Sequence, residues 1–469
     1  MTFGLLIGHS VEPIFKFMNP NIFQPVPVLS TGEIREILVR RIDQQKQAAG
    51  VVVGVIEPDG RRVVAYGNVA NGDPRPVDGD TIFEIGSVTK VFTSLLLADM
   101  VNRKEVTLDD PAAKYLPEHV KMPERSGKSI TLHDLSTHSS GLPSLPSNFK
   151  PKDLRNPYAD YRVDDLYQFL SGYELSRDPG SKLEYSNLGG GLLGHLLAYR
   201  AGTDYESLIR TRITRPLSMP DTGITLSSSM RQRMATGHTA MLAPTTNWDL
   251  PTLAGAGALR SSANDMLTFL EALLGYKESP LAPAMKAMFE VRRLDAKIGL
   301  GWLIYSADGR EIANHDGGTG GFRSWVGYDP KERTGVVVLS NGTRSGVEDI
   351  GLHLLNPKFP LANPQPPKQH TEIHIDPKLL DNYTGRYQVT PNLILEITRD
   401  GDRLFAQGFA QVTGQAIVLP KFELFPEGEK SFFARAADHQ ITFETGPEGR
   451  ATSFILHKAG RDTTAPRLS

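Results

Sequence analysis

One apolar stretch, residues 83–101, constrains the fold of this chain more than any other part of its sequence. It predicts a buried helix, because from Val88 onward its apolar residues recur at helical spacing, at Val88, Val91, Phe92, Leu95, Leu96 and Met100. Ser87 and Lys90 lie at the start of this helix in the pattern S-x-x-K. Residues three apart lie on one face of a helix, so we expect the hydroxyl and the amine to meet above its first turn.

The pair of Ser87 and Lys90 has a structural and a chemical interpretation. In the structural one, the serine caps the helix and the lysine is a solvated charge. In the chemical one, the lysine accepts the proton of the serine hydroxyl, which is a weak nucleophile without a base. Burial makes this transfer feasible, because desolvation disfavours the ammonium form and lowers the pKa of the lysine. The apolar neighbours Val88, Val91 and Phe92 favour a buried lysine and therefore the chemical interpretation.

The composition narrows the classes of function that the chain can have. Its 469 residues, of which 39% are hydrophobic and 22% charged, predict a globular core with two or three domains, or one large domain with an appendage. The formal net charge is -2 and no Lys/Arg-rich run occurs, so we expect no nucleic-acid partner. The absence of cysteine excludes disulfides, thiol catalysis and cysteine metal sites.

The first residues lack the pattern of a secretory signal. No Lys or Arg precedes the apolar run Phe3 to Ile7, and the first basic residue is Lys16. No apolar run approaches the length of a membrane-spanning helix, about 20 residues. We therefore expect no membrane span and, by default, a cytoplasmic protein, or a periplasmic one if a signal has been removed.

Hydrophobic patterning divides the chain into four parts. Residues 1–28 contain prolines without periodicity, which is typical of a surface extension, and residues 356–371 are a Pro-rich linker. In residues 29–355, an early β-hairpin and a late strand meander most simply join one antiparallel sheet, with a mostly helical segment inserted between them. Residues 372–469 contain short strands separated by turns, and they predict a small all-β barrel or sandwich.

Local signals predict individual elements within residues 29–355. Ser30 and Glu33 fit a capping box ahead of a helix. A hairpin is expected at residues 51–66, around a Pro-Asp-Gly turn. Further helices are expected at 164–170, 192–199, 205–213 and 263–274, and strands at 301–305, 311–314, 324–328 and 335–339. The expected fold class is therefore α+β, an antiparallel sheet flanked by helices with an inserted helical subdomain.

Tyr185 and Asn187, in the pattern Tyr-x-Asn, are a second candidate for chemistry. The structural interpretation is a strand end with an asparagine turn. In the chemical interpretation, a tyrosine near Lys90 is kept partly ionised and is the base for Ser87, while the asparagine amide holds a substrate amide. The motif alone does not decide between them.

His315 opens a third candidate motif, a glycine-rich segment that includes Gly317 and Gly318 and lies between two predicted strands. A glycine-rich turn lets backbone N–H groups approach a ligand closely. The N–H groups of Ser87 and Gly318 would together form an oxyanion hole, in which one donor is typically worth about a hundredfold or more in rate. The structural alternative is a hairpin loop that needs positive φ.

Three further patterns are interpreted as structural. Residues 189–194 match G-x-G-x-x-G but open no βαβ unit, so we expect no dinucleotide. His133 and His138 are not aligned on a helix, and no third ligand follows at a known spacing, so we expect no metal. Residues 255–260 are small and apolar and indicate only close packing. The sequence therefore predicts no cofactor.

Three motifs occur in the order and approximate spacing of a large family: Ser87-x-x-Lys90, Tyr185-x-Asn187 and His315-x-Gly317. The chain resembles the penicillin-recognising serine hydrolases, specifically the class C β-lactamase-like group of β-lactamases, D-Ala-D-Ala carboxypeptidases, D-aminopeptidases and family VIII esterases. Other stretches share the resemblance, at residues 83–90, 135–142, 179–187, 215–222 and 299–302. Residues 382–387 resemble the start of the lipocalin-like β-domains that follow some of these hydrolases.

The resemblance implies a β-lactamase/transpeptidase-like fold, a small C-terminal all-β barrel and a role for each motif residue. Ser87 would be acylated. Lys90 and Tyr185 would share the general-base work, and the choice between them stays open. Asn187 would bind the acyl-side amide of the substrate.

His315 is the main departure from the family pattern. It would take the place of the lysine in the family's K-T-G motif, and with Gly317 and Gly318 it would line the substrate site. A lysine there is cationic and suits a substrate carboxylate, whereas a histidine with a pKa near about 6.5 is mostly neutral at pH 7. Histidine at this position resembles the esterase and D-aminopeptidase members, which argues against efficient β-lactam hydrolysis but not against acyl transfer. Arg323, just past the loop, is a candidate for the missing positive charge.

These observations predict a serine hydrolase that acts on ester, amide or β-lactam bonds through an acyl-enzyme on Ser87. Its substrate would be a small molecule or a short D-amino-acid peptide. Two alternatives remain. One is a weakly active penicillin-binding protein that deacylates slowly, and the other is a non-catalytic interaction protein that uses the C-terminal β-domain.

Overall fold

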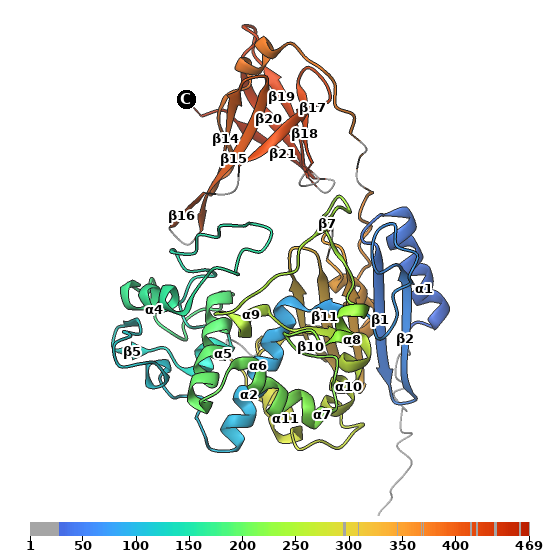
Figure 1. The fold of residues 1–469 in the computed structure, drawn as a ribbon, viewed down its shortest axis with the longest axis vertical. Helices are drawn as coiled ribbons and strands as arrows, with labels where there is room; N and C mark the ends of the chain where they lie inside the picture. Colours follow the sequence, from blue (N-terminus) through green and yellow to red (C-terminus); the bar gives the residue numbers. More distant parts are fainter. Residues whose placement is uncertain are drawn as a thin grey trace, which may run out of the picture.

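The computed structural model describes residues 28–468, apart from 294–296, 308, 345, 367, 369, 413–414, 419–420, 436–438 and 459–460. The predicted N-terminal extension, residues 1–28, lies outside the described residues except for Val28. Figure 1 shows an α+β part and a β-barrel, joined by the stretch that follows helix α12 (Glu348–Leu355). Within the described residues, no helix is long and apolar enough to cross a membrane.

A six-stranded antiparallel sheet lies at the centre of the α+β part, with the strand order β2-β1-β12-β11-β10-β9. β1 pairs with β12, so that Val51 lies opposite Ser340. The early hairpin and the late meander therefore form one sheet, which confirms the expectation from the sequence. The strands are β1 (Gly50–Glu57), β2 (Gly60–Gly67), β9 (Leu303–Ala307), β10 (Arg310–Gly318), β11 (Arg323–Asp329) and β12 (Thr334–Ser340).

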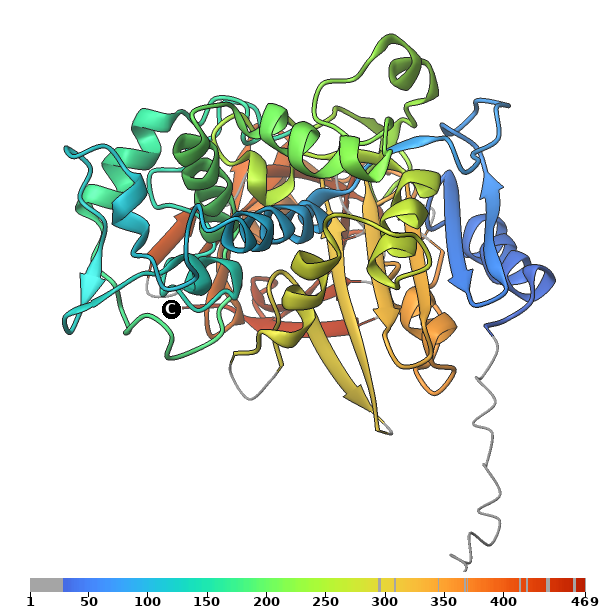
Figure 2. The ribbon, with the colours of Figure 1, turned by 90° about the horizontal axis from the view of Figure 1, so that it is seen from below.

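Both faces of this sheet are buried, which explains why β1 is a continuous apolar run and not an alternating one. Val53 belongs to a core with α1 (Thr31–Val39) and α12 on one face. Val52 belongs to the larger core on the other face, with α2 (Thr89–Asn102) and α10 (Ala263–Leu273). The helices of the inserted region gather beside α2, seen as the green helices in Figure 2.

The predicted helices of the α+β part are present. α1 begins with the expected capping box, in which Ser30 Oγ accepts the N–H of Glu33 and the Glu33 carboxylate accepts the N–H of Ser30. Ser87 lies on a 3-10 turn, Gly86–Val88, that leads directly into α2. The helices of the inserted region are α3 (Leu132–Ser136), α4 (Val163–Gly172), α5 (Asn187–Ala201), α6 (Tyr205–Ile209), α7 (Arg215–Leu217), α8 (Ser228–Arg233), α9 (Ala254–Gly257) and α11 (Ala282–Glu290).

The segment that begins at His315 differs from its prediction as a loop. His315 to Gly318 continue strand β10 and pair with β11, with Gly318 opposite Arg323. Neither Gly317 nor Gly318 has a positive φ. A Cβ on Gly317 would lie 2.1 Å from the backbone carbonyl oxygen of Ile85, and one on Gly318 would lie 2.1 Å from Arg323 Nη1, so the glycines leave room for these neighbours. The chain turns only after Gly318, where the N–H of Thr319 donates to the carbonyl of Phe322.

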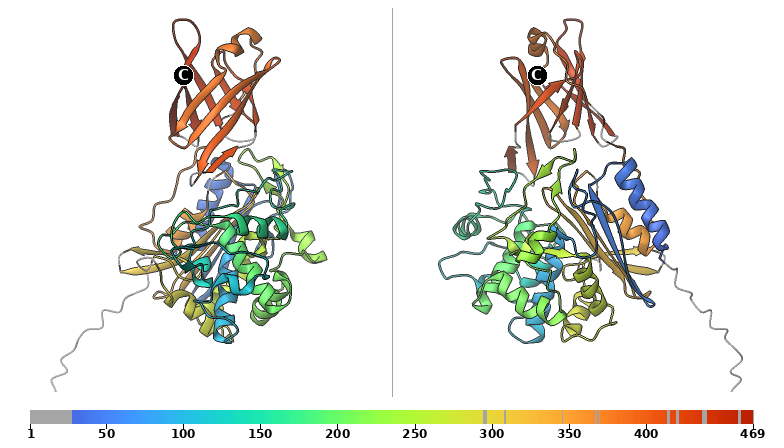
Figure 3. Two further views of the ribbon diagram at one scale, coloured as in Figure 1. Left: turned by 90° about the vertical axis from the view of Figure 1, so that its left-hand side faces the viewer. Right: turned by 45° about the vertical axis from the view of Figure 1, so that its right-hand side comes forward.

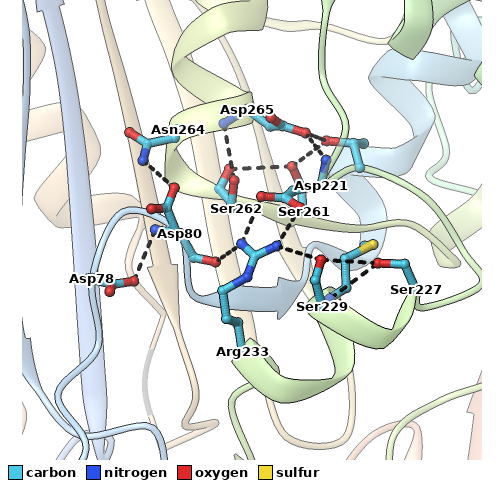
Figure 4. Close-up of polar contacts among 12 residues, drawn as sticks. Asp78, Asp80, Asp221, Ser227, Ser229, Arg233, Ser261, Ser262, Asn264 and Asp265 are labelled. Carbon is cyan, nitrogen blue, oxygen red and sulfur yellow. Dashed lines mark hydrogen bonds and ion pairs between the residues drawn. The ribbon is translucent and has the colours of Figure 1, made fainter.

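A polar network around Arg233 and Asp265 joins segments that are distant in the sequence (Figure 4). Arg233 donates two hydrogen bonds to the carboxylate of Asp221, at 2.6 and 2.7 Å, and a third to the carbonyl of Asp80. The Asp265 carboxylate accepts the N–H of Asp221 and the hydroxyl of Thr222. Asp265 follows strand β8 (Arg260–Ser262), which pairs with β3 (Ile82–Glu84), the strand that enters the 3-10 turn of Ser87. Asp221 and Thr222 are thus connected to the strand pair that leads into the turn of Ser87.

The C-terminal part is an antiparallel barrel that stands beyond the α+β part (Figures 1 and 3). Its closure is nearly complete, because Tyr387 and Arg467 form a β-bridge and the N–H of Leu468 donates to the carbonyl of Arg386. The hairpin extension β16 (Gln415–Val418) pairs with β15. The other strands are β13 (Gly385–Thr390), β14 (Leu393–Asp400), β15 (Arg403–Val412), β17 (Phe422–Pro426), β18 (Ser431–Ala434), β19 (His439–Thr445), β20 (Ala451–Lys458) and β21 (Arg461–Pro466).

Aromatic side chains fill the interior of the barrel. Tyr387, Phe443 and Phe454 are almost fully buried and pack with ring centroids 4.9 to 5.9 Å apart. Phe432 and Tyr383 complete the cluster. The expected all-β barrel is therefore confirmed, and its packed interior is a folding core.

Candidate active site

Ser87 lies where strand β10 packs against the start of α2. Gly86 adopts φ +49, and a Cβ at this position would be 2.7 Å from the backbone N of Gly318. Ser324 Oγ donates a 2.7 Å hydrogen bond to the carbonyl of Ile85 and ties β11 to the same turn. A left-handed glycine is therefore required here, both for the backbone conformation and for the approach of β10.

Lys90 is the central residue of the site, and its side chain is buried, with 3% of its surface exposed. Its Nζ lies 2.9 Å from Ser87 Oγ, 2.8 Å from Asn187 Oδ1 and 2.6 Å from the carbonyl oxygen of Ala256. Burial lowers the pKa of Lys90 to about 7, and the charge of Asp316 opposes this only in part.

The three neighbours of Lys90 fit a neutral amine. The Asn187 Oδ1 and the Ala256 carbonyl are acceptors only, so they take two N–H groups of the amine. A neutral amine then has one lone pair left, and the remaining neighbour is the hydroxyl of Ser87. The geometry therefore allows Lys90 to accept the proton of Ser87.

Tyr185 lies near Ser87 and Lys90, and it is the third polar side chain of the site. The ring of Tyr185 packs on His138, at 4.4 Å between centroids, and lies 4.9 Å from Lys90 Nζ. Burial raises the pKa of Tyr185 above its usual value, and the nearby Ser87 opposes this only in part. This favours a neutral phenol over the partly ionised tyrosine of the chemical interpretation of the motif.

His315 is buried below Tyr185, with 6.2 Å between the ring centroids. Its Nδ1 lies 2.6 Å from the carbonyl of Asp316, so the Nδ1–H donates there, and Nε2 has no hydrogen-bond partner among the described residues. Burial and the nearby Lys90 lower the pKa of His315 to about 4. The imidazole is therefore neutral at pH 7, as the sequence predicted for a histidine in this place.

The strand that carries His315 has a free edge beside Ser87. β9 pairs with β10 only as far as Asn314, and no strand in the described part of the chain covers the outer edge from His315 to Gly318. An extended substrate can therefore pair with this edge. The guanidinium of Arg323 lies against Gly318, since a Cβ on that glycine would be 2.1 Å from Arg323 Nη1.

The structure thus brings together all seven residues that the sequence predicted for the site: Ser87, Lys90, Tyr185, Asn187, His315, Gly317 and Gly318. No group of acidic or histidine side chains in the described residues is arranged to hold a metal ion. His133 instead accepts from Arg293 Nε, and His138 accepts the N–H of Ser186.

Sequence reasoning missed several residues that shape the site. The segment 255–260, interpreted as packing only, supplies the Ala256 carbonyl that holds Lys90. The glycine run of α5 makes room for the same side chain, because a Cβ on Gly190 would lie 2.9 Å from Lys90 Cε. Tyr158, a buried tyrosine near Asn187, had no motif of its own. The signal available in the sequence was the high density of small residues in segments 189–194 and 255–260.

Comparisons with known proteins agree with this fold and this grouping of side chains. The family model "Beta-lactamase" matches residues 36–355, and the family model "Domain of unknown function (DUF3471)" matches residues 369–466. The chain belongs to the β-lactamase family, among the class C β-lactamase and D-Ala-D-Ala carboxypeptidase relatives, and it carries a DUF3471 β-barrel at its C-terminal end. It is a serine hydrolase of the β-lactamase and penicillin-binding protein type.

Two curated relatives and one solved structure illustrate the similarity. The D-alanyl-D-alanine-carboxypeptidase/endopeptidase AmpH of Escherichia coli (strain K12) is 31% identical over 62% of this chain and 79% of its own length. Penicillin-binding protein 4* of Bacillus subtilis (strain 168) is 25% identical over 92% of this chain and 98% of its own. The β-lactamase/D-alanine carboxypeptidase structure from Yersinia pestis is 26% identical, with a TM-score of 0.61, over 70% of this chain and 98% of that one.

Replacing Gly317 by alanine tests whether the close approach of β10 matters. The new Cβ would lie 2.1 Å from the Ile85 carbonyl oxygen and 2.3 Å from Ser324 Oγ, so the strand must move away from the turn of Ser87. We expect kcat for p-nitrophenyl butyrate to fall about a hundredfold, as typically follows a displacement near 1 Å. Gly172→Ala is the control, because a Cβ there meets nothing within 4 Å. Full activity in a folded Gly317→Ala protein would show that the approach is dispensable.

Proposed function

We propose that this protein hydrolyses carboxylic esters, and related amide or β-lactam bonds, through an acyl-enzyme on Ser87. The observation that carries the proposal is the buried Lys90 amine, which lies 2.9 Å from the Ser87 hydroxyl. Its two other neighbours, Asn187 Oδ1 and the Ala256 carbonyl oxygen, are hydrogen-bond acceptors. Removing a charge-bearing group from water is costly, so a lysine buried beside a serine hydroxyl supports a chemical role.

In the proposed acylation step, Ser87 Oγ forms a bond to the substrate carbonyl carbon while its proton passes to Lys90 Nζ. The N–H groups of Ser87 and Gly318 hold the negative oxygen of the tetrahedral intermediate. The bond to the leaving group then breaks. Neutral Tyr185 donates its proton to the leaving group and recovers one from Lys90.

Deacylation follows with water as the nucleophile, and Lys90 and Tyr185 again relay its proton. The base is Lys90, because its pKa is about 7 while burial raises that of Tyr185. A group with this lowered pKa is increasingly neutral as the pH rises through about 7. The rate of acylation is therefore expected to rise as the pH increases through about 7.

The neutral His315 supports esters as the principal substrates. Where the family motif has a cationic lysine, this chain has an imidazole whose pKa is about 4, so it provides no charge for a substrate carboxylate at pH 7. Uncharged esters do not need that charge.

Carboxypeptidase activity on short D-amino-acid peptides is a second candidate, supported by Arg323. Burial lowers the pKa of this guanidinium, while Glu348 and Asp316 favour its charged form. It remains a cation next to Gly318, on the strand beside the substrate edge. The AmpH relative is named for this activity.

We also propose that the domains are those expected from the sequence: a hydrolase domain at 29–355, a linker at 356–371 and a β-domain at 372–469. The two family matches, 36–355 and 369–466, support these boundaries. A role of the β-domain as a binding module is the alternative that applies if the hydrolase site is inactive.

Intact-protein mass spectrometry and product assays, with wild type against Ser87→Ala, test the proposal. Each protein is mixed with a penicillin, a D-Ala-D-Ala peptide and a p-nitrophenyl ester. We expect turnover fastest for the ester and at least a thousandfold slower in Ser87→Ala, since nucleophile removal typically costs about this much or more. Exposed Ser228 supplies the control Ser228→Ala.

A persistent wild-type adduct without turnover would indicate the weakly active penicillin-binding protein instead. Identical behaviour of wild type and Ser87→Ala on all three compounds would contradict catalysis at this site and favour the interaction protein.

Arg323→Ala separates the two substrate classes. If Arg323 holds a substrate carboxylate, kcat/KM for the D-Ala-D-Ala peptide should fall tenfold or more, the typical worth of a charged hydrogen bond. The kcat/KM for a neutral ester should stay within about twofold of the wild-type value. Arg200→Ala, which removes an exposed arginine of α5, is the control for overall charge. Equal effects on the two substrates would contradict a role in carboxylate binding.

A further inference from the structure

Strand β10 carries an acidic side chain, Asp316, that the proposed reaction does not use. Asp316 lies in the part of β10 that β9 leaves uncovered, since the last pair of these two strands is Asn314 with Leu303. The side chain of Asp316 is exposed, and it makes no hydrogen bond or ion pair within the described part of the chain. Its charge reaches the catalytic groups, because it opposes the effect of burial on the pKa of both Lys90 and His315.

The pleat of the strand fixes the side of β10 on which this carboxylate lies. Successive side chains point to opposite faces of a strand, and His315 faces Tyr185, with 6.2 Å between the ring centroids. Asp316 therefore lies on the other face, on which the guanidinium of Arg323 packs against Gly318. When a substrate pairs with the free edge of β10, the group opposite Asp316 lies on this same face, at about 4.5 to 5.5 Å between Cβ positions.

The charges on this face favour a cation opposite Asp316. Asp316 and Glu348, which is exposed at the start of α12, both raise the pKa of Arg323 against the effect of burial. Two carboxylates thus accompany one guanidinium, and one negative charge is left uncompensated. His315 does not change this balance, because its imidazole is neutral at pH 7. An ammonium group in the paired segment would be attracted to Asp316, whereas a carboxylate there would be repelled.

The group opposite Asp316 belongs to the leaving-group side of the substrate. In the proposed acylation step Tyr185 donates its proton to the leaving group, and His315, which precedes Asp316, packs beside Tyr185. Gly318, whose N–H holds the oxygen of the tetrahedral intermediate in that step, lies two residues from Asp316. This separation is about 7 Å along a strand. A cation a few bonds beyond the leaving atom covers this distance.

We propose that Asp316 determines leaving-group specificity: it selects esters and thioesters whose leaving group carries an ammonium group. The inference rests on the proposed hydrolysis through Ser87 and names its substrate class. Leaving groups that carry a carboxylate, such as the terminal amino acid of a D-Ala-D-Ala peptide, bring a second negative charge to Asp316 and are disfavoured. Neutral leaving groups are accepted but gain nothing from the carboxylate.

A matched pair of thioesters tests this inference. Butyrylthiocholine and S-(3,3-dimethylbutyl) thiobutyrate have the same acyl group and leaving groups of the same shape, but the second has a tert-butyl group in place of the trimethylammonium group. After correction for their spontaneous hydrolysis, wild type should have a higher kcat/KM for butyrylthiocholine. Asp316→Asn removes the charge and keeps the size of the side chain. It should lower the ratio of the two kcat/KM values about tenfold, as expected for a charge pair at a protein surface. Any change in the pKa of Lys90 affects both thioesters and cancels in the ratio.

Asp59→Asn is the matched control. Asp59 is exposed in the turn between β1 and β2, at the opposite end of the sheet from Gly318, so this change should leave the ratio unaltered. An unchanged ratio in Asp316→Asn, or an equal fall in both variants, would overturn the inference while hydrolysis itself stands.

If Asp316→Asn does not fold, the wild-type protein decides the question. Raising the ionic strength from about 0.01 M to about 1 M screens exposed charges, so it should lower kcat/KM for butyrylthiocholine relative to the neutral thioester. An unchanged ratio over this range would overturn the inference. No Ser87-dependent turnover of either thioester would instead remove the proposed function, and this inference with it.

Discussion

The burial of one amine, that of Lys90, is the interaction on which the rest of the site depends. Three parts of the chain meet at its Nζ: the turn of Ser87, the start of α5 at Asn187 and the carbonyl of Ala256 in α9. The glycine at 190 leaves the space that the lysine side chain fills. Water is excluded, the ammonium form is disfavoured, and the pKa of Lys90 falls to about 7. The fold thus converts an ordinary lysine into a base that functions near neutral pH.

Much of the fold could be predicted from local patterns. The apolar run from Val51 and the one from Val336 have the composition of buried strands, and they pair in the sheet. Helical spacing from Val88 onward indicated α2 because its apolar side chains repeat with the period of a helix. Ser87 and Lys90 could be paired from the sequence, since their contact spans less than one helical turn. Tyr185 and His315 were joined to them through the family pattern and not through spacing alone.

Other features depend on contacts that no local pattern contains. The carbonyl of Ala256 is 166 positions from Lys90, and a backbone acceptor has no signature in the side chains. The position of Tyr158 near Asn187 depends on a segment whose carbonyl at Pro143 accepts a hydrogen bond from Ser186, just before α5. The strand conformation of Gly317 was missed because a glycine-rich segment also fits a turn, and only the neighbouring Ile85 carbonyl explains why a side chain is excluded there. Burial, which decides the protonation of both Lys90 and Tyr185, is likewise a property of the whole fold.

The most direct test of this account is an NMR titration of Lys90 in protein labelled with ¹³C at the lysine Cε, with the resonance assigned by its absence in Lys90→Met. The account predicts a midpoint near pH 7 for Lys90, whereas exposed lysines titrate near about 10.4. A midpoint near 10 would contradict it, because Lys90 would then be an ammonium ion at neutral pH and could not accept the proton of Ser87.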